Sequence, residues 1–146
     1  DRNDEAGLLR SVDQVRLLVE DEVALGIPTE RIVMAGFSQG GAVALHTALR
    51  FAQPLAGVLA LSSYLPLADG LAGQCSAERA RLAIRMDHGD SDPVVPFRVA
   101  QRSAELIRAQ GYRVEFNSYA MEHSLCPEQV MSLRSWLVER FAMDVS

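Results

Sequence analysis

A short apolar run that leads straight into a glycine-flanked serine constrains this chain more than any other feature. Residues 32–35 read Ile-Val-Met-Ala, a β-rich run typical of a central strand buried on both faces, and residues 36–40 read Gly-Phe-Ser-Gln-Gly. A helical pattern begins at about Ser38. This order of strand, G-x-S-x-G turn and helix predicts a nucleophile elbow. In such a turn Gly36 and Gly40 leave room for close backbone packing, and Ser38 stands out at the carboxyl edge of a sheet.

The same turn predicts a group that stabilises negative charge. The backbone N–H of Gln39 lies at a helix N-terminus, where it points toward any charge that develops near Ser38. The alternative interpretation is a glycine-flanked connection with no chemical role. The position directly between a strand and a helix favours the nucleophile.

The rest of the chain alternates between helical and strand-like patterns, which is typical of an α/β fold with βαβ units around a parallel sheet. The loop over residues 62–81 has no clear periodicity. Helices are predicted over about residues 7–25, 38–50, 96–111 and from 127 onward, and the last carries Val130, Leu133, Leu137 and Phe141 on one side. Strands are predicted over residues 32–35, 57–61, 82–86 and 113–116 with Tyr119.

Composition limits the possible partners and the number of domains. A chain of 146 residues with 49% hydrophobic residues can bury one sizeable core, so a single domain over residues 1–146 is expected. The net charge of −5 argues against nucleic acid or an anionic membrane as the main partner. No apolar run is long enough for a transmembrane segment. Cys75 and Cys126 form neither a disulfide framework nor a metal-ligand pattern, so a reducing, cytoplasmic location is expected.

A serine nucleophile needs a base, and the chain offers three histidines. His46 lies eight residues along the helix that starts at Ser38, roughly 12 Å by helical rise, so it cannot reach the hydroxyl. His88 ends the third strand and is interpreted as a residue bonded to its own loop. His123 follows the fourth strand, where an open α/β sheet presents residues to a site at its carboxyl edge, and is the predicted base.

The acid that orients the base is expected in the loop after the third strand, because α/β-hydrolases place Ser, Asp and His in that order. Asp90 and Asp92 are the candidates. Asp90 fits a Gly-Asp-Ser turn, in which an aspartate commonly bonds its own backbone. Asp92 precedes Pro93, which favours an extended conformation, and is the predicted acid.

Several segments carry a family resemblance in the same order along the chain. They are residues 27–41 around the elbow, residues 55–58 with 60–66, residues 88–96 (His-Gly-Asp-Ser-Asp-Pro-Val-Val-Pro) and residues 119–124. Together they resemble the phospholipase/carboxylesterase family of α/β-hydrolases, which includes acyl-protein thioesterases and bacterial carboxylesterases. The resemblance implies a three-layer α/β-hydrolase sandwich with a mostly parallel sheet.

The resemblance also implies a function. It implies a serine hydrolase that cleaves carboxylic esters or thioesters of small-molecule or lipid-like acyl groups, with no metal or organic cofactor and with possible homodimers. It assigns Ser38 as nucleophile, Asp92 as acid, His123 as base and the Gln39 N–H as one oxyanion donor. It further implies an acyl-binding surface at Tyr64 and Leu65.

The chain departs from the family at a few positions. Glu122 precedes the predicted base where the family commonly has a small or apolar residue, and Arg85 and Asp87 interrupt a strand that is usually more apolar. The chain also opens at Asp1 without an initiator Met or a signal pattern.

None of the three histidines lies in the family's His-Gly-Leu-Gly-like loop, which supplies a second oxyanion N–H. We therefore expect the C-terminal two-thirds of the fold, with the first strands missing. The alternatives are a catalytically impaired fragment, an acyl-binding module, or another α/β-hydrolase branch such as a peptidase.

Overall fold

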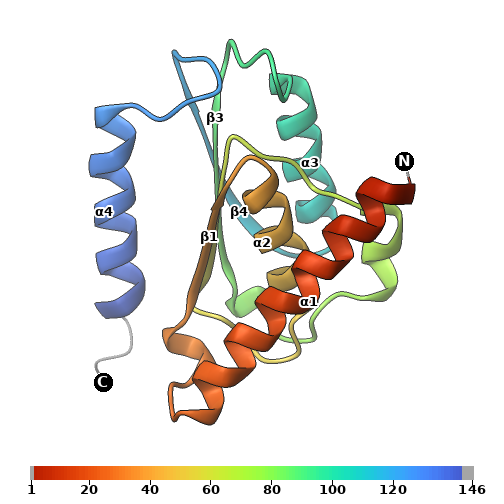
Figure 1. Cartoon of the computed structure of the whole chain (residues 1–146). Coiled ribbons are helices and arrows are strands. Elements are labelled where there is room, and N and C mark those ends of the chain that lie inside the picture. The colour runs from red at the N-terminus through yellow and green to blue at the C-terminus, as the bar shows by residue number, and fades with distance from the viewer. Residues whose placement is uncertain (1, 143–146) are drawn as a thin grey trace.

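The computed structural model describes residues 2–142, which form an α/β fold with four helices and four strands (Figure 1). The helices are α1 (Arg2–Ala24), α2 (Gln39–Arg50), α3 (Phe97–Ala109) and α4 (Pro127–Ala142). The strands are β1 (Val33–Phe37), β2 (Gly57–Leu61), β3 (Ala83–Gly89) and β4 (Arg113–Tyr119). Three short 3₁₀ helices, η1 (Thr29–Arg31), η2 (Ala68–Gly73) and η3 (Arg79–Arg81), complete the connections.

The four strands form one parallel sheet in the order β1-β2-β3-β4. Each strand pairs with the next one along the chain, so the carboxyl ends of all four meet at one edge. The register places Phe37 beside Leu61, and Asp87 beside both Leu61 and Asn117. The predicted α/β class with a parallel sheet is confirmed.

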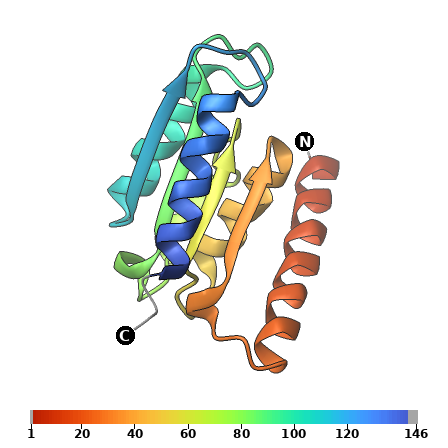
Figure 2. The same ribbon diagram turned by 90° about the vertical axis from the view of Figure 1, so that its left-hand side faces the viewer.

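The sheet is the middle of three layers. Helices α2 and α3 cover one face, with α1 packed against α2, and α4 covers the other face (Figures 1 and 2). Successive parallel connections of one hand place their helices on the same face, which explains why α2 and α3 share a side. The chain changes sides after β4, so the loop between β4 and α4 passes over the carboxyl edge of the sheet.

Burial agrees with the sequence for β2 and differs for β1. All five residues of β2 are buried, as expected of a central strand. The expectation that β1 is central and buried on both faces is wrong. Among the described residues β1 pairs only with β2, and Met34 is buried while Ala35 and Phe37 are exposed. This alternation arises because α2 packs on one face of β1, whereas α4 lies over the neighbouring strands (Figure 2).

The third strand is longer than its interrupted apolar pattern indicates. It runs over Ala83–Gly89 because Arg85 and Asp87, which point to the same face, form a buried ion pair with Nε–Oδ1 at 2.9 Å. A charged residue therefore fits within this strand because its partner lies two positions further along.

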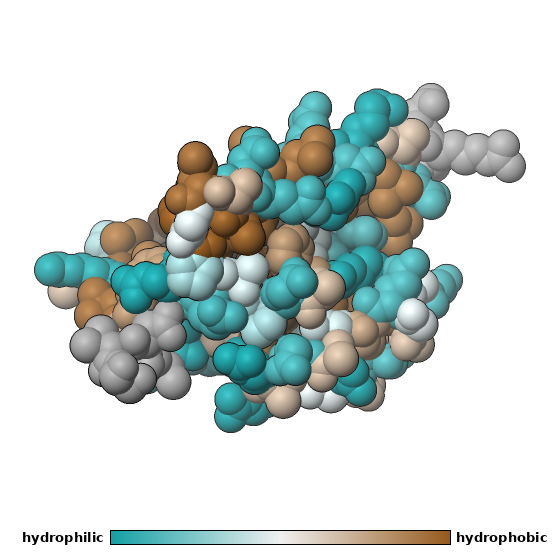
Figure 3. Space-filling model, turned by 90° about the horizontal axis from the view of Figure 1, so that it is seen from below, coloured by the Kyte–Doolittle hydropathy of each residue, from teal (hydrophilic) through white to brown (hydrophobic). Residues whose placement is uncertain are grey.

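Two helices present apolar residues outside the core. The predicted apolar side of α4 lines a surface pocket of about 550 Å³, while Gln129 and Trp136 face inward. On α1, Leu18 is 64% exposed. Figure 3 views the molecule from below, toward the amino ends of the strands, and shows hydrophobic residues gathered beside hydrophilic ones.

Candidate active site

The turn between β1 and α2 has the geometry predicted for Ser38. The serine is the N-cap of α2 with φ 57° and ψ −121°, a left-handed conformation that is strained for a non-glycine residue. Its N–H donates to the carbonyl of Leu61 at 2.8 Å, which ties the turn to the end of β2. Gln39 is the first residue of α2, so its N–H has no acceptor within the helix.

The close backbone packing predicted for the two glycines of this turn is confirmed at Gly36 but not at Gly40. A Cβ atom at Gly36 would lie 2.2 Å from the carbonyl carbon of Gly40, so the backbone itself fills that space. A Cβ atom at Gly40 would meet nothing within 4 Å, and the expectation that this glycine is needed for space is wrong. The crowded position is Gly41, where a Cβ would lie 2.7 Å from Oγ of Ser63 and 2.9 Å from the carbonyl oxygen of Gly36.

The structure joins Ser38, His123 and Asp92 in one chain of hydrogen bonds. His123 Nε2 lies 3.0 Å from Ser38 Oγ, and His123 Nδ1 lies 2.7 Å from Asp92 Oδ2. A carboxylate can only accept, so Nδ1 carries the proton and Nε2 is left to accept from the serine hydroxyl. This is the arrangement in which a base takes the proton of a serine while an acid fixes its tautomer.

Several contacts hold Asp92 as an ionised acceptor. Its side chain is buried, and Oδ1 accepts from the N–H groups of Val94 and Val95, each at 2.8 Å. Burial acts to raise the pKa of Asp92, but the hydrogen bond from His123 and those two backbone donors outweigh it and lower the pKa. Asp90 is exposed, and its carboxylate accepts from the adjacent Ser91 hydroxyl at 3.2 Å.

The other two histidines lie outside this chain of hydrogen bonds. His88 is buried, and its Nε2 is 2.7 Å from the carbonyl oxygen of Val95, in agreement with its interpretation as a residue bonded to its own loop. The same nitrogen lies 3.4 Å from Asp92 Oδ2. His46 is buried in α2, its Nδ1 has no hydrogen-bond partner, and burial followed by the charge of Arg50 lowers its pKa to about 4.

The two residues implied for acyl binding lie in different environments. Tyr64 lines a pocket of about 270 Å³ together with Asp4, Glu5, Leu8, Gln39, Pro66 and Leu67. Leu65 belongs to the hydrophobic core, and its N–H is bonded to Ser103 Oγ at 2.9 Å. The pocket beside Gln39 is therefore lined by Tyr64, whereas Leu65 anchors the loop in the core.

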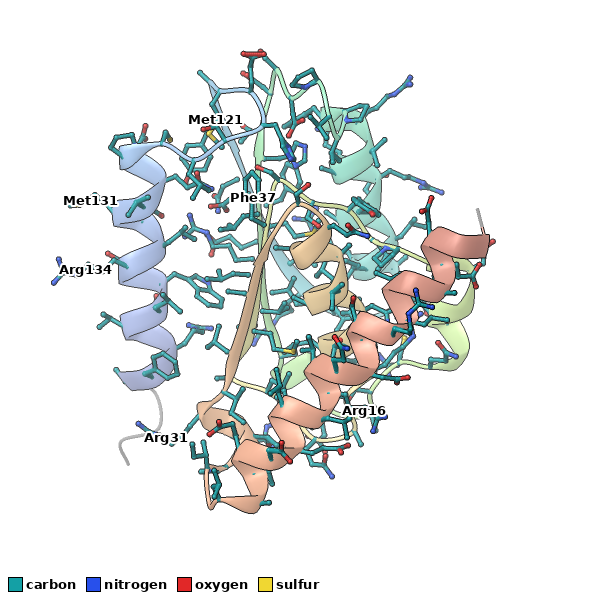
Figure 4. The ribbon with its side chains drawn as sticks, in the orientation of Figure 1. Arg16, Arg31, Phe37, Met121, Met131 and Arg134 are labelled. Carbon is teal, nitrogen blue, oxygen red and sulfur yellow. The ribbon has the colours of Figure 1, made fainter. Side chains whose placement is uncertain are left out.

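Sequence reasoning missed three residues that support the site. Ser63 Oγ donates to the carbonyl oxygen of Ser38 at 2.7 Å, and Ser62 has φ 53° directly after β2. The ring of Phe37 lies 4.8 Å from that of His123, between centroids. Figure 4 shows Phe37 at the end of β1 and Met121 in the loop above it. The paired serines directly after a buried strand were the available signal, because that strand ends at the same edge as the elbow.

Strand β3 supports the site through close contact between its backbone and the backbone of the loop that carries His123. A Cβ atom at Gly89 would lie 2.2 Å from the carbonyl oxygen of Glu122, so β3 touches the loop that carries His123. Glu122 itself is exposed, although a small or apolar residue is expected there.

Two features are absent from residues 2–142. Within this range there is no group of three or more His, Cys, Asp or Glu side chains placed to hold a metal ion. None of the described helices has the length and apolar character needed to cross a membrane.

Known proteins share this fold and these segments. The thioesterase named Acyl-protein thioesterase 1 from Cryptococcus neoformans var. neoformans serotype D is 38% identical over 153 residues, covering 95% of this chain. The crystal structure of Arabidopsis thaliana SOBER1 superposes with a TM-score of 0.88 at 28% identity, covering 93% of this chain and 65% of that one. Zea mays acyl-protein thioesterase 2 gives a TM-score of 0.81, also at 28% identity and with the same coverage.

The chain spans 64% of the length of the Cryptococcus protein. A family model described as Phospholipase/Carboxylesterase matches residues 1–139, which is nearly the whole chain. With the sheet order, the elbow and these relatives in agreement, the chain belongs to the phospholipase/carboxylesterase family.

Proposed function

We propose that the protein is a serine hydrolase that cleaves carboxylic esters or thioesters through an acyl-enzyme intermediate. The observation that carries the proposal is the continuous hydrogen-bond chain from Ser38 Oγ through His123 to Asp92, with distances of 3.0 Å and 2.7 Å. The strained elbow supports it, because it holds the hydroxyl away from its own strand and beside a helix N-terminus.

The reaction follows from these positions. Ser38 Oγ attacks the acyl carbonyl carbon while His123 Nε2 takes the hydroxyl proton, and the Gln39 N–H donates to the resulting oxyanion. The protonated imidazole then gives its proton to the departing alcohol or thiol, and the acyl group stays on Ser38. A water molecule that loses its proton to the same nitrogen attacks the acyl-enzyme and releases the carboxylic acid.

Support for the substrate class comes from the relatives and from the pocket beside the elbow. Two of the compared proteins are named acyl-protein thioesterases, which favours an acyl ester or thioester of a lipid-like or small molecule. Tyr64 and Gln39 line the neighbouring pocket, and Leu8 and Leu67 supply apolar surface there. We assign Tyr64 to the acyl or leaving-group contact, and Leu65 to the support of that loop.

The second candidate is a catalytically impaired acyl-binding protein. The observation that favours it is that residues 2–142 provide a single proposed oxyanion donor, the Gln39 N–H at the start of α2. Loss of one donor slows an acyl-transfer enzyme by about 10²–10³-fold. The two candidates differ in whether the acyl group is released from Ser38.

The test combines a fluorophosphonate probe with substrate turnover. We expect the probe to add to Ser38, as read by peptide mass, and the protein to hydrolyse a p-nitrophenyl ester and an acyl thioester. Ser38→Ala should remove both signals and leave the far-ultraviolet circular dichroism unchanged. Ser91→Ala, a change at an exposed serine next to Asp90, is the matched control and should keep both.

The outcomes separate the candidates. Turnover that survives Ser38→Ala, or probe addition at another serine, overturns the assignment of the nucleophile. Acylation of Ser38 without release of the acid supports the impaired protein. Cleavage of peptide substrates in preference to esters supports a peptidase.

Two further expectations remain predictions. The free thiols of Cys75 and Cys126 suit a reducing compartment, and location of a tagged protein outside the cytoplasm would contradict it. A homodimer is tested by light scattering of the purified protein.

A further inference from the structure

A buried polar network lies between the sheet and α4, outside the chain of hydrogen bonds at Ser38. Its centre is Asp87, which is buried on β3 one residue before His88. Burial acts to lower the pKa of Arg85, but its hydrogen bonds and ion pair with Asp87 outweigh burial and raise the pKa. The guanidinium of Arg85 is therefore charged inside the protein.

The carboxylate of Asp87 accepts four hydrogen bonds from three elements. Arg85 of β3 donates through Nε at 2.9 Å and Nη2 at 3.0 Å, and Asn117 of β4 donates at 3.1 Å. Gln129 of α4 donates the fourth bond from Nε2 to Oδ2 at 3.1 Å. All four hydrogen bonds are of ordinary length. Because their donors come from three elements, the buried carboxylate of Asp87 has all its partners only when β3, β4 and α4 are correctly placed relative to one another.

Gln129 connects this centre to the loop that carries His123. Its side chain is fully buried, and its Oε1 accepts the N–H of Cys126 at 3.3 Å. Cys126 is the last residue of the loop before α4 begins at Pro127. A single side chain thus binds Asp87 with one atom and the end of the His123 loop with the other.

The other end of the loop is fixed by the same network. Arg85 Nη2 donates to the hydroxyl of Tyr119 at 3.1 Å, and Tyr119 is the last residue of β4. The loop over residues 120–126 is therefore held at both ends by groups bound to Asp87 or to its ion-pair partner. Figure 4 shows Met131 and Arg134 pointing away from the sheet, on the opposite side of α4 from Gln129.

We propose that Gln129 is a positioning residue. Its hydrogen bonds to Asp87 and Cys126 fix the position of the His123 loop relative to the carboxyl edge of the sheet. The catalytic consequence rests on the proposed function, whereas the effect on the hydrogen bond between His123 and Asp92 does not. Asp87 and Asp92 belong to β3 and the loop that follows it, so α4 is positioned against the element that carries the acid. A shift of about 1 Å at a catalytic group can cost about 100-fold in rate.

The test replaces Gln129 with a residue of similar shape that forms neither bond. In Gln129→Met we expect kcat to fall about 10- to 100-fold with KM within about twofold, because His123 is displaced while the substrate pocket is unchanged. The low-field proton resonance of His123 Nδ1–H, identified by its absence in His123→Ala, should disappear or move upfield.

The matched control is Trp136→Leu, on the same buried face of α4 two turns further along. A Cβ atom at Gly57 would lie 2.6 Å from the Trp136 ring, so this residue packs on the sheet far from the loop. The control should lower the melting temperature but keep the resonance and kcat. If Trp136→Leu loses the resonance and lowers kcat as much as Gln129→Met does, Gln129 acts only through general packing and the proposal is overturned.

A second variant serves if Gln129→Met does not fold. Gln129→Glu keeps the acceptor for Cys126 but sets a carboxylate against Asp87. The charged and titratable groups around this pair are Arg85 of β3 and its partners Tyr119 and Glu115 of β4. At pH 8 the His123 resonance of this variant should be weaker than that of the unmodified protein. It should recover toward pH 6, where the carboxyl group introduced at position 129 can take up a proton and donate a hydrogen bond to Asp87. An unchanged resonance in this variant at pH 8 overturns the proposal.

Failure of the proposed function would look different. If the unmodified protein shows the resonance but hydrolyses no ester, the proposed function fails, and the positioning role is decided by the resonance in the variants. If the unmodified protein lacks the resonance, the positioning role is overturned whatever the turnover.

Discussion

A Cβ atom on Gly36 would lie 2.2 Å from both the carbonyl carbon and the carbonyl oxygen of Gly40. Neither group can move, because both belong to the backbone of the turn and of the first turn of α2. We expect Gly36→Ala to lower the free energy of unfolding by about 3 kcal/mol or more and to remove probe addition at Ser38. Denaturant titration measures the first effect, and peptide mass measures the second.

The control for this prediction is the other glycine of the pentapeptide. A Cβ atom at Gly40 would enter open space, so Gly40→Ala should raise the free energy of unfolding by about 0.5 kcal/mol through its effect on the unfolded chain. Equal destabilisation by the two changes would contradict the geometry of the turn.

The elbow is also held by the segment that directly follows β2. The Ser63 hydroxyl donates to the carbonyl oxygen of Ser38 at 2.7 Å, so Ser63→Ala leaves that partly buried oxygen with one donor fewer. We expect a loss of about 1 kcal/mol in the free energy of unfolding and a several-fold lower kcat at unchanged KM. Ser135→Ala, at an exposed serine of α4, is the control and should change neither quantity.

The two aspartates of the loop after β3 should differ sharply in their effect on catalysis. Asp92→Asn gives His123 Nδ1 a partner that no longer fixes its tautomer, and kcat should fall by about 10⁴-fold. Asp90 is exposed and bonded to Ser91, so Asp90→Asn should leave kcat within about twofold. Steady-state kinetics at pH 7.5 measures both, and a comparable loss from Asp90→Asn would reverse the assignment of the acid.

Stability should fall in weak acid because of His46. Burial and the nearby charge of Arg50 lower its pKa to about 4 in the folded protein, whereas the unfolded chain takes up a proton near its ordinary pKa of 6.5. The unfolded state therefore binds more protons between these two values. The free energy of unfolding should decline by about 2 kcal/mol as the pH falls from 6.5 to 4.

His46→Leu isolates this effect from other acid-sensitive groups. The variant has no proton to bind at this position and no unpartnered ring nitrogen in the core. Its melting temperature should change less between pH 7 and pH 5 than that of the unmodified protein. Identical pH dependence of the two proteins would show that His46 does not resist protonation in the folded state.

Much of the fold was accessible from the sequence because the relevant signals are local. The G-x-S-x-G turn and the apolar run of β2 each depend on a few neighbouring residues. The order Ser38, Asp92, His123 follows from strand order, because parallel strands bring their following loops to one edge.

The remaining features depend on contacts that no local pattern records. The four-residue apolar run of β1 has the composition of a central strand, but its burial depends on which helices lie over it. Arg85 was expected to interrupt β3, and its charge is tolerated only because Asp87, Asn117 and Gln129 meet there from three elements. Periodicity found the apolar stripe of α4 but could not show that Gln129 and Trp136 form the inward side.

The shared carboxyl edge of the parallel sheet also has a kinetic consequence. Ser38 and His123 are 85 positions apart in the chain, and they meet only after three parallel strand pairs have formed by long crossovers. Pairings of this kind close large loops and form slowly. The ability of Ser38 to react should therefore appear late when the denatured protein is returned to native conditions, after the helices have already formed.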